Sequence, residues 1–334
     1  MSNVLCVLES FRRHMDSGRI LFQRGMEQCG WQSIGRDCPP PEVDMVDVKQ
    51  AVKQFHTKIV LMWPRYEFDS REWSGQEVQP KHCFVNWEYL LERDDIMRVV
   101  VWHDAGSDRA LQKQWHEDYM PHAYLSWYHE ESVMPFASYV QRNQIVRTYH
   151  NINPEAVPAF AKRSGTAIVS GAYTHDVYPL RTNCFSWARS GLLGDGVDYM
   201  LHPGYSQSGT HSDSYCETLS RYRVAICTAS SYRFALRKLF EATACGCRVI
   251  TDLPEYDAIP YIDGNFVRVR QSITHADLKT IVQREASEWD AEKQKHFADL
   301  AITHYNYRSE CARVTSELER KYAELQRIKP IVQN

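Results

Sequence analysis

The segment of residues 234–253, FALRKLFEATACGCRVITDL, constrains the fold of this chain more than any other. An amphipathic run that carries Arg237, Lys238 and Glu241 ends at Gly246 and leads directly into an apolar run. A helix that ends on a glycine and abuts a strand is typical of a nucleotide-binding αβ unit. The free N–H groups in the first turn of such a helix can hold a phosphate. The alternative is an ordinary buried α/β crossover with a solvated charged face.

Composition indicates a folded, globular protein. The chain has 334 residues, which exceeds the usual size of a single core, so we expect two domains. Hydrophobic residues make up 43% and charged residues 24% of the sequence, which excludes a disordered chain. The formal net charge of −3 argues against general binding of polyanions.

The cysteines indicate a reducing compartment. Ten cysteines are scattered through apolar runs and form no CxxC pair and no Cys/His ligand spacing. This usage favours a cytoplasmic protein, in the host cytoplasm if it is viral, over a disulfide framework. Nothing in the sequence approaches the roughly 18 apolar residues of a membrane span. We therefore expect no membrane span, no bound metal and no cofactor beside the substrates.

The first half of the chain alternates between strands and helices. Short apolar runs predict strands at residues 4–8, 58–63, 97–102 and 123–127. Amphipathic runs predict helices near residues 20–29, 43–55, 87–93, 110–119 and 132–139. Gly18 is expected in a polar turn between the first strand and the first helix.

A second series begins after a break at Asn153-Pro154 and Pro158. Here we expect strands at residues 167–171, 199–202, 224–227, 248–251 and 266–269. We expect helices at residues 178–192, 214–221 and from 234 onward. Residues 275–328 are expected to be helical, in two segments divided near Asp290.

Strands and helices that alternate at this spacing predict parallel βαβ units and the α/β class. We expect two Rossmann-like domains, residues 1–153 and 154–270, that face each other across a cleft. A C-terminal helical tail, residues 271–334, is expected to pack across both. Ligands of open α/β sheets bind at the carboxyl ends of the strands, so this cleft is the expected site.

Three local strings resemble glycosyltransferases of the two-Rossmann (GT-B) type. Residues 241–250, EATACGCRVI, look like the family's E-A-x-A-C-G-x-P-V-I segment in the donor domain. Residues 100–104, VVWHD, resemble the acceptor-domain strand that ends in a His-Asp pair. Residues 170–181 resemble the first strand and loop of the donor domain. The resemblance is closest to the retaining, nucleotide-sugar-dependent group that includes spore-maturation-type glycosyltransferases.

The chain departs from that pattern at three positions. The family often has a glutamate eight positions before Glu241, where this chain has Arg233, so that sugar-contacting carboxylate is missing. Arg248 replaces the proline of the segment. Only Gly18 stands where the family has a Gly-Gly turn after the first strand.

The resemblance implies a donor site in the second domain, formed by Gly171, Arg181, Arg237, Lys238 and Glu241. Cations in the first turns of a helix oppose its dipole unless an anion binds there, which favours neutralisation of a diphosphate. Glu241 would accept hydrogen bonds from the two ribose hydroxyls, and Arg181 would be a further phosphate ligand. The alternatives are solvated cations and an Arg237–Glu241 pair, four positions apart, that only stabilises the helix.

The acceptor side is expected in the first domain. His103 and Asp104 follow the strand at residues 97–102 and would contact the transferred sugar or position the acceptor hydroxyl. The alternative for His103 is a structural histidine. The first 36 residues carry five arginines against three acids, and we expect the acceptor to be bound by Arg12, Arg13 and Gly18. Such a basic rim suits a polyanion such as DNA, and the alternative is a mixed-charge helix surface.

The predicted function is transfer of a hexose or pentose from a nucleotide-diphosphate donor, such as a UDP-sugar, to a hydroxyl acceptor. No metal ion is required in this prediction. A hydroxymethylated base in DNA fits as the acceptor, and a carbohydrate, a protein or a small molecule fits equally. A nucleotide-sugar epimerase of the same fold is one alternative. A non-catalytic nucleotide-sugar or nucleic-acid binding module is another, favoured by Arg233.

Overall fold

A computed structural model of the chain describes residues 4–8, 17–35, 46–63, 84–102, 109–172, 174–201 and 211–328. The chain divides into two compact units. The first unit comprises residues 1–15, 22–148 and 310–334, and the second comprises residues 16–21 and 149–309. The predicted boundaries fall at 153/154 and 270/271.

The first unit is built on a parallel sheet of six strands in the order β2-β1-β4-β6-β7-β8. Its strands are β1 (Val4–Leu8), β2 (Gln32–Gly35), β4 (Ile59–Trp63), β6 (Met97–Trp102), β7 (Ala123–Ser126) and β8 (Ile145–Arg147). A separate parallel pair consists of β3 (Val46–Asp47) and β5 (Phe84–Val85). Every described residue of the central strands β6 and β7 is buried, as is typical of a parallel sheet covered on both faces.

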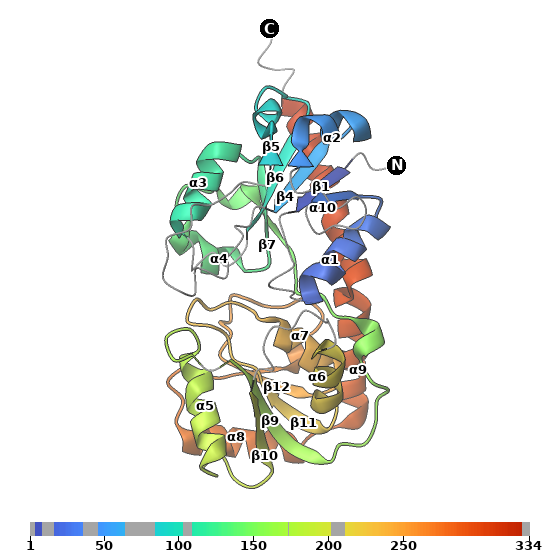
Figure 1. Cartoon of the computed structure of the whole chain (residues 1–334). Coiled ribbons are helices and arrows are strands. Elements are labelled where there is room, and N and C mark those ends of the chain that lie inside the picture. Colours follow the sequence, from blue (N-terminus) through green and yellow to red (C-terminus); the bar gives the residue numbers. More distant parts are fainter. Residues whose placement is uncertain are drawn as a thin grey trace, which may run out of the picture. The chain divides into compact units, whose positions relative to one another are not determined.

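Helices accompany this sheet on both sides, as Figure 1 shows. They are α1 (Ser17–Gln28), α2 (Val48–Phe55), η2 (Trp87–Leu90), α3 (Arg109–Tyr119), α4 (Glu130–Val133), η3 (Met134–Phe136), η4 (Arg142–Gln144) and α10 (Tyr307–Ile328). The Asp47 carboxylate accepts a hydrogen bond from the Gln50 N–H at 2.9 Å and so caps α2.

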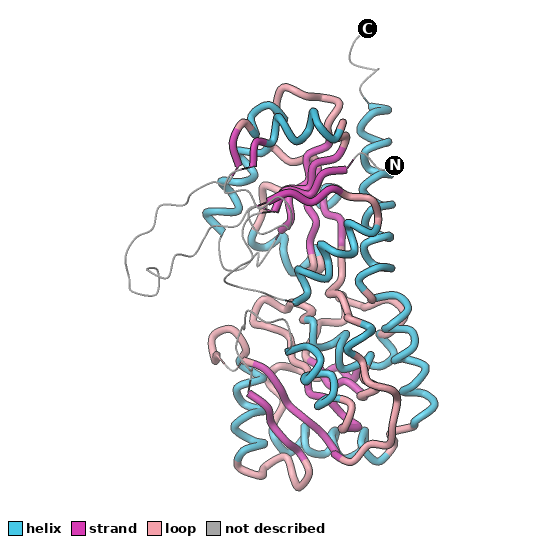
Figure 2. Tube along the Cα trace, turned by 45° about the vertical axis from the view of Figure 1, so that its right-hand side comes forward, coloured by secondary structure: helices cyan, strands magenta, loops and turns pink. Residues whose placement is uncertain are grey.

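The long helix α10 returns the chain to the first unit, as the tube in Figure 2 shows. The indole N–H of Trp31 donates to Thr315 Oγ1 at 2.9 Å, and the Thr148 hydroxyl donates to Glu310 Oε1 at 2.8 Å. Glu310 is 1% exposed and also pairs with Arg313 at 2.6 Å, so its buried charge is compensated. These contacts tie residues more than 160 positions apart in sequence.

The second unit is built on a parallel sheet of five strands in the order β10-β9-β11-β12-β13. Its strands are β9 (Gly165–Gly171), β10 (Val197–Leu201), β11 (Tyr222–Ile226), β12 (Arg248–Thr251) and β13 (Phe266–Arg268). Its helices are η5 (Pro154–Ala156), α5 (Pro179–Arg189), α6 (His211–Leu219), α7 (Arg237–Ala244), η6 (Asp263–Asn265), α8 (His275–Ser287) and α9 (Ala291–Tyr305).

Two apolar layers hold this second sheet. On one face, residues of α5 and α8 such as Leu180, Phe185 and Leu278 pack against the strands. On the other face, the strands are covered by residues of α6, α7 and α9, such as Leu239 and Phe240. Because both faces are covered by apolar contacts, the polar groups gather at the ends of the strands, where a ligand can approach.

The α/β class and the alternation of elements are confirmed, and β1 and β6 have the predicted bounds. The turn predicted at Gly18 is wrong, because α1 begins at Ser17. The buried face of that helix, which includes Phe22 and Met26, outweighs the small helix penalty of one glycine in the first turn. Strands β2 and β8 were not predicted, since they are short and lack an apolar pattern.

Several predicted helices differ in extent. The run at 87–93 is a single 3₁₀ turn, and the run at 132–139 is a short α4 followed by a 3₁₀ turn with a proline in its first positions. Helix α2 begins at Val48, after the capping Asp47, and α7 begins at Arg237. The helical tail breaks at Asp290, as predicted, and again at Asn306.

Candidate functional site

Two cations converge on the backbone at the carboxyl end of β9. The ammonium of Lys238 donates to the carbonyl oxygen of Ser170 at 2.7 Å. A Cβ placed on Gly171 would lie 1.4 Å from Lys238 Nζ and 3.3 Å from Arg181 Nη1. Gly171 has φ +117°, which only glycine adopts without strain. The missing side chain of Gly171 is therefore the space in which the Lys238 ammonium lies.

Arg181 is fixed by hydrogen bonds from each of its three nitrogens. Its Nε donates to Thr228 Oγ1 at 3.1 Å, Nη2 donates to the Thr228 carbonyl at 3.0 Å, and Nη1 donates to the Ala172 carbonyl at 3.0 Å. The guanidinium also lies over the Tyr178 ring, 3.9 Å from its centroid. Arg181 is only 2% exposed, so its position is set by the fold.

The sheet order explains why these groups meet. From β9 the chain continues to β10 on one side of that strand and then crosses to β11 on its other side. The topological switch point of the sheet therefore lies between β9 and β11. Ala172 follows β9 and Thr228 follows β11, and Arg181 bridges the two. Open α/β sheets bind ligands at this point of the carboxyl edge.

Neither cation forms an ion pair with a carboxylate anywhere in the described residues. Burial and the neighbouring Arg181 charge lower the pKa of Lys238 from its ordinary 10.5 to about 7. The ammonium has three N–H donors, of which the Ser170 carbonyl takes one. Two adjacent cations with spare donors and no anion make a site that an anionic group would stabilise.

Arg237 and Glu241 pair with each other across one turn of α7. Arg237 Nε lies 2.9 Å from Glu241 Oε1, and the side chains are 14% and 7% exposed. The spacing of four residues allowed two interpretations, a contact with the donor or an ion pair that stabilises the helix. The structure shows the ion pair. Glu241 lies near enough to Lys238 to act on its pKa, so it still borders the cation site.

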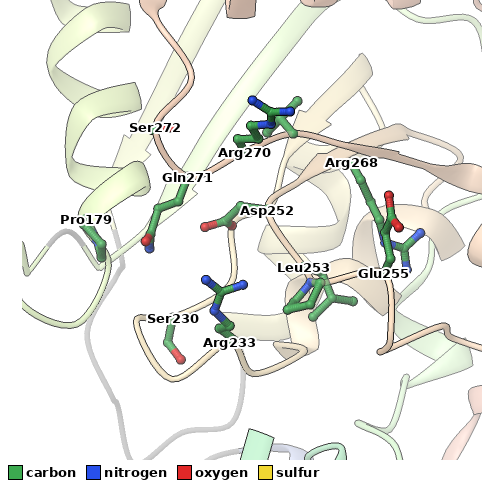
Figure 3. A pocket seen from close by; sticks show the side chains of 12 residues that line it. Pro179, Ser230, Arg233, Asp252, Leu253, Glu255, Arg268, Arg270, Gln271 and Ser272 are labelled. Atoms are coloured by element: carbon green, nitrogen blue, oxygen red, sulfur yellow. The ribbon is translucent and has the colours of Figure 1, made fainter. Parts of the chain in front are cut away.

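A cavity of ≈ 780 Å³ opens at the carboxyl ends of β11, β12 and β13. Figure 3 shows its lining, which Pro179 closes at the start of α5. The other lining residues are Ser230, Arg233, Asp252, Leu253, Pro254, Glu255, Arg268, Val269, Arg270, Gln271 and Ser272. The loops that follow three neighbouring strands thus supply nearly all of it.

The charges of the cavity are unequally compensated. Arg268 pairs with Asp263 through two hydrogen bonds of 2.7 and 3.0 Å, so it is neutralised. Asp252 accepts the Ala229 N–H at 2.7 Å, and burial raises the pKa of its carboxyl, opposed by that bond and by the Arg181 and Arg233 charges. Arg270 is exposed and makes no side-chain bond to any described residue.

Of the predicted donor residues, the structure brings Gly171, Arg181 and Lys238 together and sets the Arg237–Glu241 pair beside them. The sequence did not indicate the acidic and basic lining of the cavity. Asp252 and Arg270 come one and two residues after β12 and β13, and their place at strand ends is the signal that could have found them.

The acceptor-side predictions mostly concern residues that the structure does not describe. His103, Asp104, Arg12 and Arg13 lie outside the described residues, and Gly18 lies in the first turn of α1. Across the described ranges, no group of three or more His, Cys, Asp or Glu side chains could hold a metal ion. No helix within those ranges is both long and apolar enough to cross a membrane.

Comparisons with known proteins identify the fold. No protein-family model matches the chain, and no curated protein matches it. Solved structures match along nearly its whole length. A glycosyltransferase from Rickettsia africae has 11% identity and a TM-score of 0.52, with 97% of this chain and 98% of that one covered. AviGT4, a glycosyltransferase involved in avilamycin A biosynthesis, has 10% identity and a TM-score of 0.55, with coverage of 96% and 97%.

The Anabaena protein HepE in complex with UDP-glucose is also similar, at 8% identity, a TM-score of 0.54 and coverage of 95% and 99%. All three matches extend over both parallel sheets. The chain has the fold of the GT-B glycosyltransferases. The GT-B prediction is thereby confirmed at the level of the fold, and the spore-maturation-type subgroup stays a prediction.

We expect Gly171→Ala to disturb the cation site directly. The new Cβ would overlap the Lys238 ammonium and would also strain a backbone with φ +117°. The free energy of unfolding should fall by about 1–3 kcal/mol, measured by urea denaturation. Gly191→Ala is the matched control, because φ is +72° and the position has nothing within 4 Å. Equal losses in the two variants would show that only backbone strain matters at Gly171.

We expect Lys238→Met to stabilise the protein at neutral and acid pH. Unfolding returns the Lys238 pKa from about 7 to its ordinary 10.5, so between these values the unfolded chain binds the extra proton. The stability of the wild type should therefore rise with pH across this window. The buried cation destabilises the fold most below pH 7, where the gain from methionine should be largest.

The measurement is the melting temperature of both proteins from pH 6 to 10. Lys293→Met, at an exposed lysine of α9, is the control and should change little. A lower melting temperature for Lys238→Met at pH 6 would mean that the ammonium helps to hold the fold.

Proposed function

We propose that this protein is a glycosyltransferase that transfers a sugar from a nucleotide-diphosphate donor to a hydroxyl acceptor. The observation that carries the proposal is the pair of cations, Arg181 and Lys238, over Gly171 at the switch point of the second sheet. A nucleoside diphosphate supplies the anion that this pair lacks. The GT-B fold supports the proposal, and HepE, a protein of similar fold, is known in complex with UDP-glucose.

The chemistry of sugar transfer suits these cations. The acceptor oxygen gives up its proton, to solvent or to the leaving diphosphate, and forms a bond to the anomeric carbon, while the bond from that carbon to the β-phosphate oxygen breaks. Negative charge grows on the leaving diphosphate, and Lys238 has N–H donors available to meet it. Arg181 is held by three hydrogen bonds and needs no rearrangement as the charge develops. In this proposal no metal ion is required.

The remaining predicted residues complete the proposal. Glu241 would accept hydrogen bonds from the ribose hydroxyls with the carboxylate that also pairs with Arg237. His103 and Asp104 would contact the transferred sugar or position the acceptor hydroxyl. The acceptor class rests on the sequence alone, and a hydroxymethylated DNA base is one candidate for Arg12 and Arg13 to bind.

The first experiment incubates the protein with a panel of nucleotide sugars and acceptors, followed by mass spectrometry. Transfer to an acceptor, or slow hydrolysis of the donor, supports a transferase. An isomerised donor would indicate an epimerase, and binding without turnover a non-catalytic module. Loss of activity in excess chelator, restored by Mg²⁺ or Mn²⁺, would contradict the metal-independent part of the proposal.

A second experiment ties donor binding to Lys238. The diphosphate of UDP-glucose is a diester and does not titrate between pH 7 and 9, so it is a suitable probe. Since Lys238 must carry a proton to bind it and its pKa is about 7, the Kd should rise as the pH increases from 7 to 9, by up to tenfold per unit. Calorimetry at several pH values measures this dependence.

Lys238→Met should bind UDP-glucose weakly at all these pH values, and the pH dependence should disappear. Charge-assisted hydrogen bonds are worth roughly 1.5–3 kcal/mol, so the loss at pH 7 should be about ten- to a hundredfold. Lys293→Met should retain the wild-type profile. Tight, pH-independent binding by Lys238→Met would place the diphosphate elsewhere.

A further inference from the structure

Two side-chain hydroxyl groups meet at the carboxyl end of β9, next to the carbonyl that holds Lys238. The hydroxyl oxygens of Ser170 and Tyr215 lie 2.7 Å apart and are hydrogen-bonded to each other. The carbonyl oxygen of the same Ser170 accepts from the Lys238 ammonium, also at 2.7 Å. Ser170 therefore joins this hydroxyl pair to the cation site.

The hydroxyl pair stands where apolar side chains would fill the space as well. Tyr215 belongs to α6, and its ring packs against the apolar layer of α6, α7 and α9. Ser170 is 2% exposed and lies two residues after Ile168 of that layer, on the same face of β9. Burying a hydroxyl costs free energy unless it is hydrogen-bonded. Phenylalanine and alanine would avoid that cost, so packing alone does not account for the two hydroxyls.

The bond within the hydroxyl pair leaves one O–H donor unused. Each hydroxyl has one proton, and the bond between them uses one of the two. No other group in the described ranges bonds to either oxygen. Tyr215 is only partly buried and is the more accessible of the two residues. A ligand is served best when Ser170 donates to Tyr215 and the Tyr215 O–H points outward.

The charges around Tyr215 are those of the cation site. Tyr215 acts on the pKa of Arg181, so its hydroxyl is close to that guanidinium. Burial, more than the neighbouring Cys227, Glu241 and Cys216, raises the pKa of Tyr215 well above its ordinary 10. The hydroxyl therefore keeps its proton at neutral and mildly basic pH. A diphosphate bound at the cation site would meet a donor that does not titrate there.

We propose that Tyr215 is a ligand of the donor diphosphate and that its hydroxyl, oriented by Ser170, completes the cation site. This inference rests on the proposed function. A hydrogen bond to a charged acceptor is shorter and stronger than one between neutral groups. It strengthens further as negative charge grows on the leaving diphosphate. Tyr215 is then a donor-binding residue, and Ser170 is a positioning residue that acts through it.

The first test measures the Kd of UDP-glucose by calorimetry for the wild type and for Tyr215→Phe. The variant lacks only the phenolic oxygen, so affinity should fall about ten- to a hundredfold, as expected for one hydrogen bond to a charged group. The melting temperature of each variant is measured alongside.

Tyr222→Phe is the matched control. The Tyr222 hydroxyl donates to Asp198 Oδ2 at 2.7 Å, and the ring fills the space beside Gly165, at the start of β9. Both variants thus lose a tyrosine hydrogen bond of the same length, at opposite ends of one strand. Tyr222→Phe should bind UDP-glucose like the wild type. Equal affinity in Tyr215→Phe and the wild type would overturn the proposal.

Inorganic pyrophosphate identifies the group that Tyr215 contacts. This probe carries the diphosphate without the base, the ribose or the sugar. Tyr215→Phe should weaken the binding of pyrophosphate and of UDP-glucose by the same factor. A loss confined to UDP-glucose would assign the hydroxyl to the nucleoside or the sugar and would also overturn the proposal.

A double-mutant cycle tests the role of Ser170. Ser170→Ala retains the carbonyl that Lys238 uses and leaves the Tyr215 O–H present but no longer oriented, so affinity should fall less than in Tyr215→Phe. In the Tyr215→Phe background, Ser170→Ala should cause no further loss, because the serine acts through the tyrosine. Additive losses would show that the two side chains act separately and would refute the positioning role.

The pH profile separates Tyr215 from Lys238. Because Tyr215 keeps its proton between pH 7 and 9, Tyr215→Phe should raise the Kd of UDP-glucose by the same factor throughout. The pH dependence that Lys238 causes should remain. A flattened profile in Tyr215→Phe would mean that the tyrosine only sets the pKa of the lysine, which contradicts a direct contact with the diphosphate.

These outcomes distinguish failure of the Tyr215 assignment from failure of the proposed function. If UDP-glucose binds with the pH dependence of Lys238 and Tyr215→Phe changes nothing, the proposed function stands and the assignment fails. If no nucleotide sugar of the panel binds the wild type, both fail. If another nucleotide sugar binds, it replaces UDP-glucose in the same comparisons.

Discussion

The contact between Lys238 and the backbone at Gly171 is the interaction on which the rest of the site depends. It holds an ammonium where burial and a second cation both disfavour its charge. The fold tolerates this arrangement because the strands on either side are covered by apolar layers that hold them in register. A protein that needed only a stable core would have an apolar side chain here, so the cation is retained at a cost in stability.

The two cations have different tasks. Arg181 uses all three of its nitrogens within the protein and joins the loops after β9 and β11, so it fixes the shape of the switch point. Lys238 gives one hydrogen bond to Ser170 and has donors to spare. In a site of low polarity, an anion is stabilised most by a positive charge that is already fixed in place and has few partners within the protein.

The sequence predicted the elements of this site better than their contacts. Strand–helix alternation was visible because parallel strands are continuous apolar runs, and the pair Arg237–Glu241 was visible because helix neighbours are four residues apart. The approach of Lys238 to Gly171 joins residues far apart in sequence and depends on the order of strands, which periodicity does not encode. The lining of the cavity was not predicted for a similar reason, since Asp252 and Arg270 become neighbours only when β12 and β13 pair.

The order of the strands decides which side chains meet at the carboxyl edge of the second sheet. The loop after β11 reaches this edge and brings Arg233 into the lining of the cavity, whereas Arg181 is placed by α5 and Lys238 by α7. The charges of Arg181 and Arg233 both act on Asp252, so this carboxyl links the cation pair and the cavity electrostatically. A change in the loop after β11 can therefore alter the charge of the cavity while the contact of Lys238 with the backbone at Ser170 and Gly171 stays in place.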